Sequence, residues 1–105
     1  MDAEEQLGIF WHNTALAELD DILADAKERR GLDAAVNLLN DINNTVAWLA
    51  SYPDYGRSGR IEGTRELVVR KSGHVIGYAH LPDARIVRLH IGHGRQQWPD
   101  KMPEL

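Results

Sequence analysis

Two helical patterns joined by only two residues constrain the fold of this chain more than any other feature of its sequence. Apolar residues recur at three- and four-residue intervals in each pattern, as they do on one face of an amphipathic helix. They are Leu16, Leu19, Ile22, Leu23 and Ala26 in the first pattern and Ala35, Leu39, Ile42, Val46 and Leu49 in the second. We expect Asn13 or Thr14 to cap the N-terminus of the first helix and Gly31 to end it. Asp33 is expected to cap the N-terminus of the second helix. A connection as short as residues 31–32 allows only an antiparallel neighbour, so we predict a helical hairpin.

Four segments with the alternation and residue types of β-strands flank this hairpin. Residues 7–11 precede it, and residues 64–70, 74–80 and 85–91 follow it, with turns at 71–73 and 81–84. The short turns join the last three strands into an antiparallel sheet. The order β-αα-βββ predicts one α+β domain over residues 1–105, in which the hairpin packs on one face of a three-stranded antiparallel sheet with an additional N-terminal strand.

Length and composition exclude several classes of protein. The 105 residues, 43% of them hydrophobic, suffice for one modest core. The absence of cysteine rules out disulfides and thiolate zinc sites. No apolar run is long enough to span a membrane, and the acidic start MDAEEQLG does not resemble a secretory signal. We therefore expect a cytoplasmic protein that does not associate with membranes, with residues 1–6 and 100–105 frayed.

The two halves of the chain differ in charge. Residues 1–50 carry three basic and ten acidic side chains, whereas residues 51–105 carry nine basic and six acidic ones, and together they give a net charge of −4. Such asymmetry is typical either of a basic working surface on the second half or of uneven surface solvation. The stretch GRSGRIEGTRELVV, residues 56–69, concentrates glycine and arginine just before a predicted strand and favours a surface that meets anions or an acidic partner.

Strand alternation predicts which side chains lie on the sheet face that the helices leave uncovered. In the last strand Val87, Leu89 and Ile91 share one face, which we expect to pack on the helices. The side chains expected on the uncovered face are Glu66, Arg70, Tyr78, Arg88 and His90, with Arg57, Arg60 and His93 at its rim. Histidine, glutamate and arginine are the residue types that general acid–base cleavage of a phosphodiester needs. An antiparallel sheet with one solvated face produces the same pattern without any chemistry, so both interpretations stay open.

The sequence contains no convincing metal or cofactor motif. His90 and His93 lack a third ligand at a suitable spacing, so no metal site is expected. The glycines at positions 56, 59 and 63 follow a helix and lack the GK[ST] ending of a phosphate loop, so we expect no nucleotide cofactor. Trp11 and Trp48 are predicted to lie in the core, and Trp98 is predicted to cap one end of the sheet.

Four stretches resemble the RelE/ParE superfamily of toxins from type II toxin–antitoxin modules, the plasmid-stabilisation systems. FWHNTALAELDDI is similar to the superfamily's opening W-x-x-x-A-x-x-D-L-x-x-I. YPDYGRSGRIEGTRELVV is similar to its P-x-x-G-R-x-G-R-x-x-G-T-R-E-L-V-V. VIGYAH and HGRQQWP correspond to its Y-x-I-x-Y-x-V strand and its closing H-G-A-Q-x-W-P. The resemblance covers nearly the whole chain, and the central and closing motifs together are specific.

The resemblance implies a growth-arrest protein that a cognate antitoxin holds inactive. Antitoxins of this superfamily wrap an acidic, partly disordered segment around the toxin, which suits the basic second half of this chain. The residues expected to contact the antitoxin are Arg60, Arg65, Arg88 and Trp98. Whether the toxin forms a dimer or a hetero-oligomer with its antitoxin is left open.

The molecular target divides this superfamily. ParE-like members inhibit DNA gyrase, whereas RelE-like members are endoribonucleases, or mRNA interferases, that cut messenger RNA on the ribosome. His93 matches a histidine of some of these nucleases, but their third-strand arginine is Val75 here, and their last-strand arginine is His90, with Arg88 two positions away. A ribosome-binding nuclease is also expected to be strongly cationic, unlike this chain. The comparison favours a gyrase inhibitor.

Each target implies roles for the same candidate residues. As a nuclease, the chain would use His93, His90 and Glu66 for acid–base chemistry. The residues expected to bind the target or its phosphates are Arg57, Arg60, Arg65, Arg70, Arg88 and Tyr78. A third alternative is an inactive relative that persists as a binding module for its antitoxin.

Overall fold

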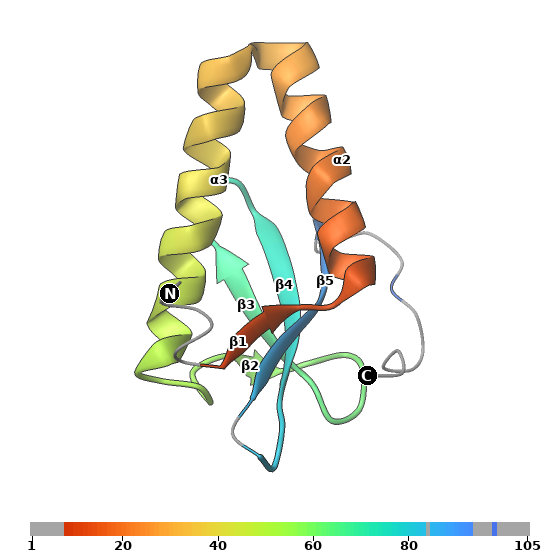
Figure 1. The fold of residues 1–105 in the computed structure, drawn as a ribbon, viewed down its shortest axis with the longest axis vertical. Coiled ribbons are helices and arrows are strands. Elements are labelled where there is room, and N and C mark those ends of the chain that lie inside the picture. Colours follow the sequence, from red (N-terminus) through yellow and green to blue (C-terminus); the bar gives the residue numbers. More distant parts are fainter. Residues whose placement is uncertain (1–7, 84, 94–97, 99–105) are drawn as a thin grey trace.

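The computed structural model of this chain describes residues 8–83, 85–93 and 98. The elements are β1 (Ile9–Trp11), α2 (Asn13–Arg30), α3 (Leu32–Ala47), the 3-10 helix η1 (Trp48–Ala50), β2 (Arg57–Ser58), β3 (Arg65–Val69), β4 (His74–His80) and β5 (Ile86–His93). The two long helices form the predicted hairpin, which extends past one end of the sheet (Figure 1). Within the described ranges no helix is long and apolar enough to cross a membrane. The termini predicted to fray lie outside the described residues.

Gly31 alone connects the two helices, because Leu32, predicted to belong to the connection, is the first residue of α3, and the caps also differ from those expected. His12, not Asn13 or Thr14, caps α2, because its Nδ1 accepts a hydrogen bond of 3.2 Å from the Thr14 amide. Gly31 ends α2 at a φ of +95°, a conformation that favours glycine, and donates to the Lys27 carbonyl. Gly31 also precedes α3 directly, so Asp33 lies inside the first turn of α3, where its charge complements the helix dipole instead of capping the helix.

The α+β class is confirmed, but the sheet has five strands in the order β1-β5-β4-β3-β2, not three. The N-terminal strand joins the edge of the sheet, where Ile9 pairs with Ile86 in parallel. The chain between this parallel pair includes the helical hairpin and strands β2 to β4, which is far longer than the dozen residues that a parallel connection needs. At the opposite edge the two-residue strand β2 pairs antiparallel with the start of β3.

Alternation along β5 is interrupted by a β-bulge. His90 pairs with Gly77, but the next pair joins Arg88 to Tyr78, so Leu89 is an extra residue on the bulged strand. Side chains before the bulge therefore lie on the opposite face from that expected. Val87 and Leu89 pack with Ala79 in a small separate cluster, whereas Ile91 joins the main core against the helices.

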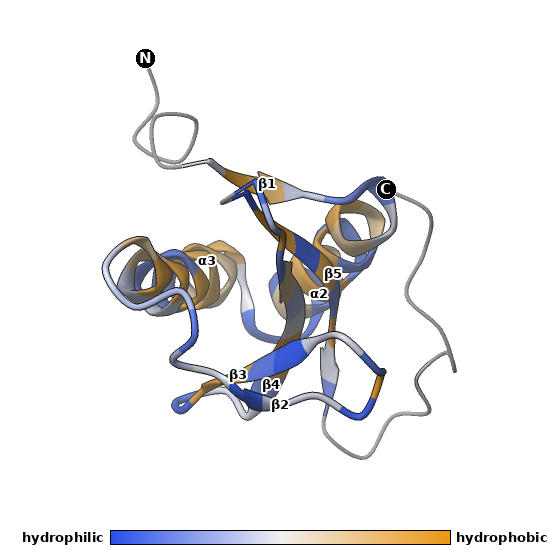
Figure 2. Cartoon of the chain, turned by 90° about the horizontal axis from the view of Figure 1, so that it is seen from below, coloured by the Kyte–Doolittle hydropathy of each residue, from blue (hydrophilic) through white to orange (hydrophobic). Residues whose placement is uncertain are grey.

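Two polar residues lie on the face opposite to that predicted: Arg88 because of the bulge, and Tyr78 because it shares the core face of β4 with Ile76. Arg88 and Tyr78 are both fully buried and lie on the helix-covered side of the sheet, not on the uncovered face. Tyr78 belongs to the main hydrophobic core. Of the predicted core tryptophans, Trp11 packs at the margin of this core, but Trp48 is 52% exposed. Both helices carry apolar as well as polar residues along their length, and apolar residues also occur on β1 and β5 (Figure 2).

Candidate functional site

One row of side chains crosses the uncovered face of the sheet. The strand registers place Arg57 of β2 beside Glu66 of β3, Glu66 beside Gly77 of β4, and Gly77 beside His90 of β5. Directly paired residues point to the same face of a sheet. Trp98 lies over this row, because a Cβ on Gly77 would be 2.6 Å from its ring. We call the side chains that gather here the open-face cluster: Arg57, Arg60, Glu66, His90 and Trp98.

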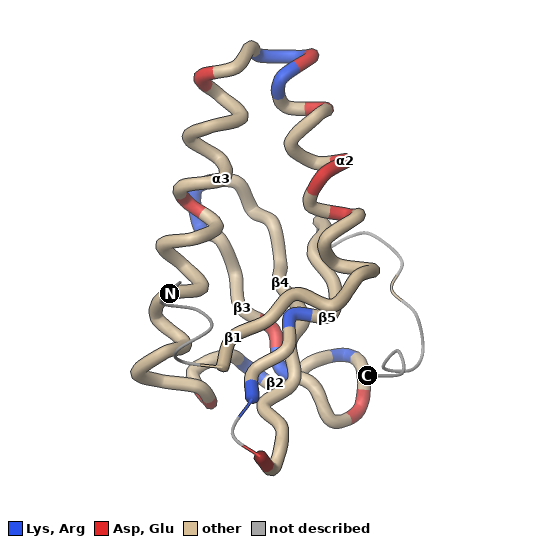
Figure 3. Tube along the Cα trace, viewed as in Figure 1, with Lys and Arg blue, Asp and Glu red and all other residues tan. Residues whose placement is uncertain are grey.

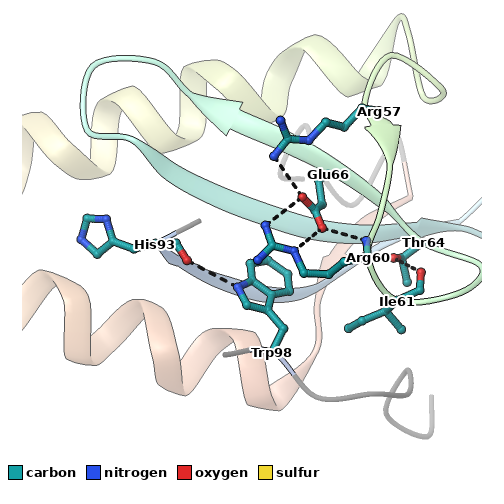
Figure 4. Close-up of polar contacts among 7 residues, drawn as sticks. All are labelled: Arg57, Arg60, Ile61, Thr64, Glu66, His93 and Trp98. Carbon is teal, nitrogen blue, oxygen red and sulfur yellow. Dashed lines mark hydrogen bonds and ion pairs between the residues drawn. The ribbon is translucent and has the colours of Figure 1, made fainter. Parts of the chain in front are cut away.

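Glu66 is the centre of the open-face cluster. Its side chain is only 4% exposed. The carboxylate accepts hydrogen bonds from Arg57 Nη2 at 3.1 Å and from Arg60 Nε at 2.9 Å (Figure 4). The backbone N–H of Arg60 donates to the same carboxylate at 2.9 Å. Burial alone would raise the pKa of Glu66, but the hydrogen bonds from Arg60 and Arg57 outweigh it and lower the pKa to about 2. Glu66 is therefore ionised at neutral pH, and both of its oxygens accept hydrogen bonds from arginine.

Trp98 connects the two sides of the cluster. The Arg60 guanidinium carbon lies 4.6 Å from the Trp98 ring centroid, within the range of a cation–π interaction, and the His90 ring lies 5.7 Å away on the same indole. Trp98 thus packs over the sheet face, not at an end of the sheet as predicted. Glu18 of α2 lies 3.2 Å from His90 Nδ1. His90 Nε2 is buried and has no hydrogen-bond partner among the described residues.

The glycine- and arginine-rich loop before β3 is a closed turn. The N–H of Gly59 donates to the Thr64 carbonyl at 2.8 Å, and the Thr64 hydroxyl donates to the Ile61 carbonyl at 2.6 Å. A Cβ on Gly59 would overlap the Thr64 hydroxyl, so glycine is needed there for close approach. This turn directs the backbone N–H and the side chain of Arg60 toward Glu66.

Arg65 and Tyr78 hold a different loop, on the other face of the sheet. Arg65 Nη1 donates to the Gly56 carbonyl at 2.9 Å and to the Asp54 carbonyl at 3.1 Å. The Tyr78 hydroxyl donates to the Pro53 carbonyl at 2.8 Å and accepts from the Gly56 amide at 2.9 Å. These contacts tie the 53–56 loop to the sheet.

Arg88 secures the N-terminal strand. Its Nε donates to the Phe10 carbonyl at 3.1 Å, and its guanidinium carbon lies 3.9 Å from the centroid of the Trp11 ring. Arg70 lies beyond the end of β3 and is exposed. The arginines 57, 60, 65 and 88 therefore do not line one cationic surface, and the expected single basic face is wrong. Acidic positions follow α2, whereas basic positions are spread over the hairpin tip and the sheet (Figure 3).

The three candidate catalytic residues are divided between the two faces. His93, which belongs to β5 and does not follow it, pairs with His74, and the two ring centroids are 4.6 Å apart. Both rings line a cavity of about 500 Å³ beneath the hairpin, with Ile22 and Leu38. Burial, together with the charges of His93 and Arg30, lowers the pKa of His74. Among the described residues no group of three histidine or acidic side chains could hold a metal ion.

An exposed aromatic cluster was missed by the sequence analysis. Trp48 lies 5.2 Å from Tyr52 and 6.1 Å from Tyr55 between ring centroids, and all three side chains are about half exposed. A signal was present, because Trp48 lies outside the apolar stripe that contains Val46 and Leu49. Glu18, the partner of His90, gave no such signal, because 72 residues separate the two.

Comparisons with known proteins agree with the fold. The family model described as "ParE toxin of type II toxin-antitoxin system, parDE" matches residues 9–98. "Putative toxin Y4kP" of Sinorhizobium fredii (strain NBRC 101917 / NGR234) is 42% identical over 91 residues, which are 87% of this chain and 92% of that protein. A solved structure titled "Chromosomal ParDE TA system from P. aeruginosa" is similar in fold, with a TM-score of 0.74 and 23% identity over 82% of this chain and 94% of the other. The chain belongs to the ParE family of toxins from type II toxin–antitoxin systems.

Proposed function

We propose that this ParE-family toxin arrests growth by binding and inhibiting DNA gyrase and that a cognate antitoxin keeps it inactive. Family membership supports a toxin whose action requires release from an antitoxin. The candidate acid–base groups lie on different faces of the sheet. This separation favours a protein target over cleavage of RNA.

A nuclease needs its acid and its base within reach of the same phosphate, one at the attacking oxygen and the other at the leaving oxygen. His90 pairs with Gly77 in the row of the open-face cluster, whereas His93 pairs with His74 and faces the cavity beneath the hairpin. Glu66 shares a face with His90, but its pKa of about 2 makes it a poor general base at neutral pH. Arg57 and Arg60 both form ion pairs with the Glu66 carboxylate, so binding a phosphate would require them to give up these contacts.

The residues proposed to meet the target lie at the exposed margin of the open-face cluster. The Arg57 side chain is 59% exposed although one of its nitrogens pairs with Glu66. Trp98 is half-buried and presents part of its ring beside Arg60. Arginine and tryptophan are the residue types most enriched among energetically dominant contacts in protein interfaces.

Induction of the toxin alone in bacterial cells tests this proposal against RelE-like messenger RNA cleavage. We expect a DNA-damage response and trapped gyrase cleavage complexes, with no codon-linked cuts by primer extension. The Arg57→Ala variant is expected to arrest growth less, and His93→Ala to arrest it as the wild type does. Arrest with intact DNA, and with message cuts that disappear in His93→Ala, would establish the nuclease instead. Normal growth at confirmed soluble levels would indicate an inactive relative.

A further inference from the structure

The cavity beneath the hairpin has no part in the proposed inhibition of gyrase, and it lies on the other face of the sheet from the open-face cluster. Its volume of about 500 Å³ is within the range of cavities that hold small molecules. Its walls come from α2, α3, the turn between β3 and β4, and the ends of β4 and β5. Part of the lining is apolar, with Ile22, Ala26 and Leu38, so the cavity suits an organic molecule better than an inorganic ion.

Basic side chains gather around His74 in this cavity. Burial lowers the pKa of His74, and so do the positive charges of His93 and Arg30, which therefore lie close to its ring. The His74 and His93 ring centroids are 4.6 Å apart. Arg30 makes no ion pair with any described carboxylate, and Lys71 has only a long contact of 3.7 Å with Asp41. This part of the cavity is therefore suited to an anion.

Ser72 occupies one ring nitrogen of His74 and leaves the other for a ligand. Its Oγ accepts a hydrogen bond of 3.3 Å from the backbone N–H of His74 and lies 2.8 Å from Nδ1 of the ring. When the Ser72 hydroxyl donates to Nδ1, the ring proton is on Nε2. Nε2 has no hydrogen-bond partner among the described residues. It is thus a donor that a bound anion can use.

The same cavity also carries acceptor groups. Asp21 and Asp25 line it, and Asp25 already pairs with Arg29 at 2.8 Å. Asp21 makes no ion pair within the part of the chain that the structure describes. Nine positions separate Asp21 from Arg30, or about 14 Å along the helix axis, so an organic body is needed to contact both. A carboxylate accepts hydrogen bonds from the hydroxyl or amino groups of such a body.

We propose that this cavity binds a small organic phosphate, with the phosphate at Arg30, Lys71 and His74 and a hydroxyl or amino group of the ligand at Asp21. A phosphate group carries nearly two negative charges at neutral pH, which suits this set of basic groups better than the single charge of a carboxylate. Arginine binds phosphate through paired N–H donors, and lysine binds it as a point charge. The proposal depends on neither the gyrase target nor the antitoxin.

Nuclear magnetic resonance of the imidazole protons in the full chain tests this site, with adenosine 5′-monophosphate (AMP) as the probe. A phosphate beside His74 favours the protonated ring, so His74 is expected to titrate at higher pH with AMP than without it. Adenosine, which lacks the phosphate, should leave the titration unchanged, and His90 on the other face should not respond to either compound. A His74 titration that AMP leaves in place, or that adenosine shifts equally, would overturn the proposal. A response at His90 alone would do the same.

A matched pair of variants tests the role of Arg30. Arg30→Ala and Lys27→Ala each remove one positive charge from an exposed position in the last turn of α2, but only Arg30 lines the cavity. By isothermal titration calorimetry, Arg30→Ala is expected to weaken AMP binding by at least about tenfold and Lys27→Ala by less than about twofold. Equal losses in the two variants would show that AMP responds only to the overall charge of the protein and would refute the site.

Discussion

The ion-pair network around Glu66 makes the stability of this fold depend on pH. The pKa of its carboxyl falls from an ordinary 4.5 to about 2 in the folded chain. A depressed carboxyl pKa contributes stability above the unfolded value and loses it as the pH falls toward the folded value. At about 1.4 kcal/mol per pKa unit, Glu66 contributes on the order of 3 kcal/mol to the free energy of unfolding at neutral pH. About 2 kcal/mol of this is lost by pH 3.

Glu66→Gln isolates this contribution, because glutamine keeps the shape of the side chain but cannot ionise. Urea unfolding followed by circular dichroism at pH 7, 5, 4 and 3 gives the free energy of unfolding of both proteins. Other acids with lowered pKa values, Asp54 and Asp83, are present in both, so only the difference between the two curves is used. We expect the wild type to be more stable by about 3 kcal/mol at pH 7, with the gap closing toward pH 3. Curves that stay parallel would show that the two arginines do not stabilise the carboxylate.

Three further substitutions test the packing. Gly77→Ala should lower the free energy of unfolding by about 1–3 kcal/mol in thermal unfolding, because its Cβ meets the Trp98 ring. A Gly77→Ala/Trp98→Ala double variant should recover most of that cost. Simple addition of the two single effects would contradict the contact. Arg88→Ala should lower the free energy of unfolding in urea by about 3 kcal/mol, because the buried Arg88 holds the Phe10 carbonyl of β1. The control, Arg85→Ala at an exposed position, should lower it by less than about 0.5 kcal/mol. Equal effects would refute the anchoring of β1 by Arg88. Tyr78→Phe should cost about 1–3 kcal/mol in the same assay, and an unchanged midpoint would refute its role in holding the 53–56 loop.

The division of the candidate catalytic residues has a simple geometric origin. His90 and His93 are three positions apart on one strand, and an odd separation along a regular strand places two side chains on opposite faces. The sequence analysis placed His93 beyond the strand, where this rule does not apply. Because β5 continues through His93, the register decides the face, and the two histidines cannot act on one phosphate without a change in the strand.

The bulge at Leu89 shows why alternation alone misplaced Arg88. The sequence RIVRLHI alternates regularly, and nothing in it marks an extra residue. The bulge exists only relative to β4, where Tyr78 pairs with Arg88 but Gly77 pairs with His90. Trp98 over Gly77 is a similar case, because the two residues are 21 positions apart and no local pattern in the sequence indicates their contact.

The amino-acid sequence by itself determined the features that depend on neighbours along the chain. The apolar stripes and the two-residue connection specify the helical hairpin, the alternating segments specify β3, β4 and β5, and the motif around residues 56–69 indicates the toxin family. Only the tertiary structure decided which strands form the edges, where the bulge falls and which arginines meet Glu66. These depend on pairings between distant segments, whose register is selected by the packing of the whole sheet and not by any local pattern.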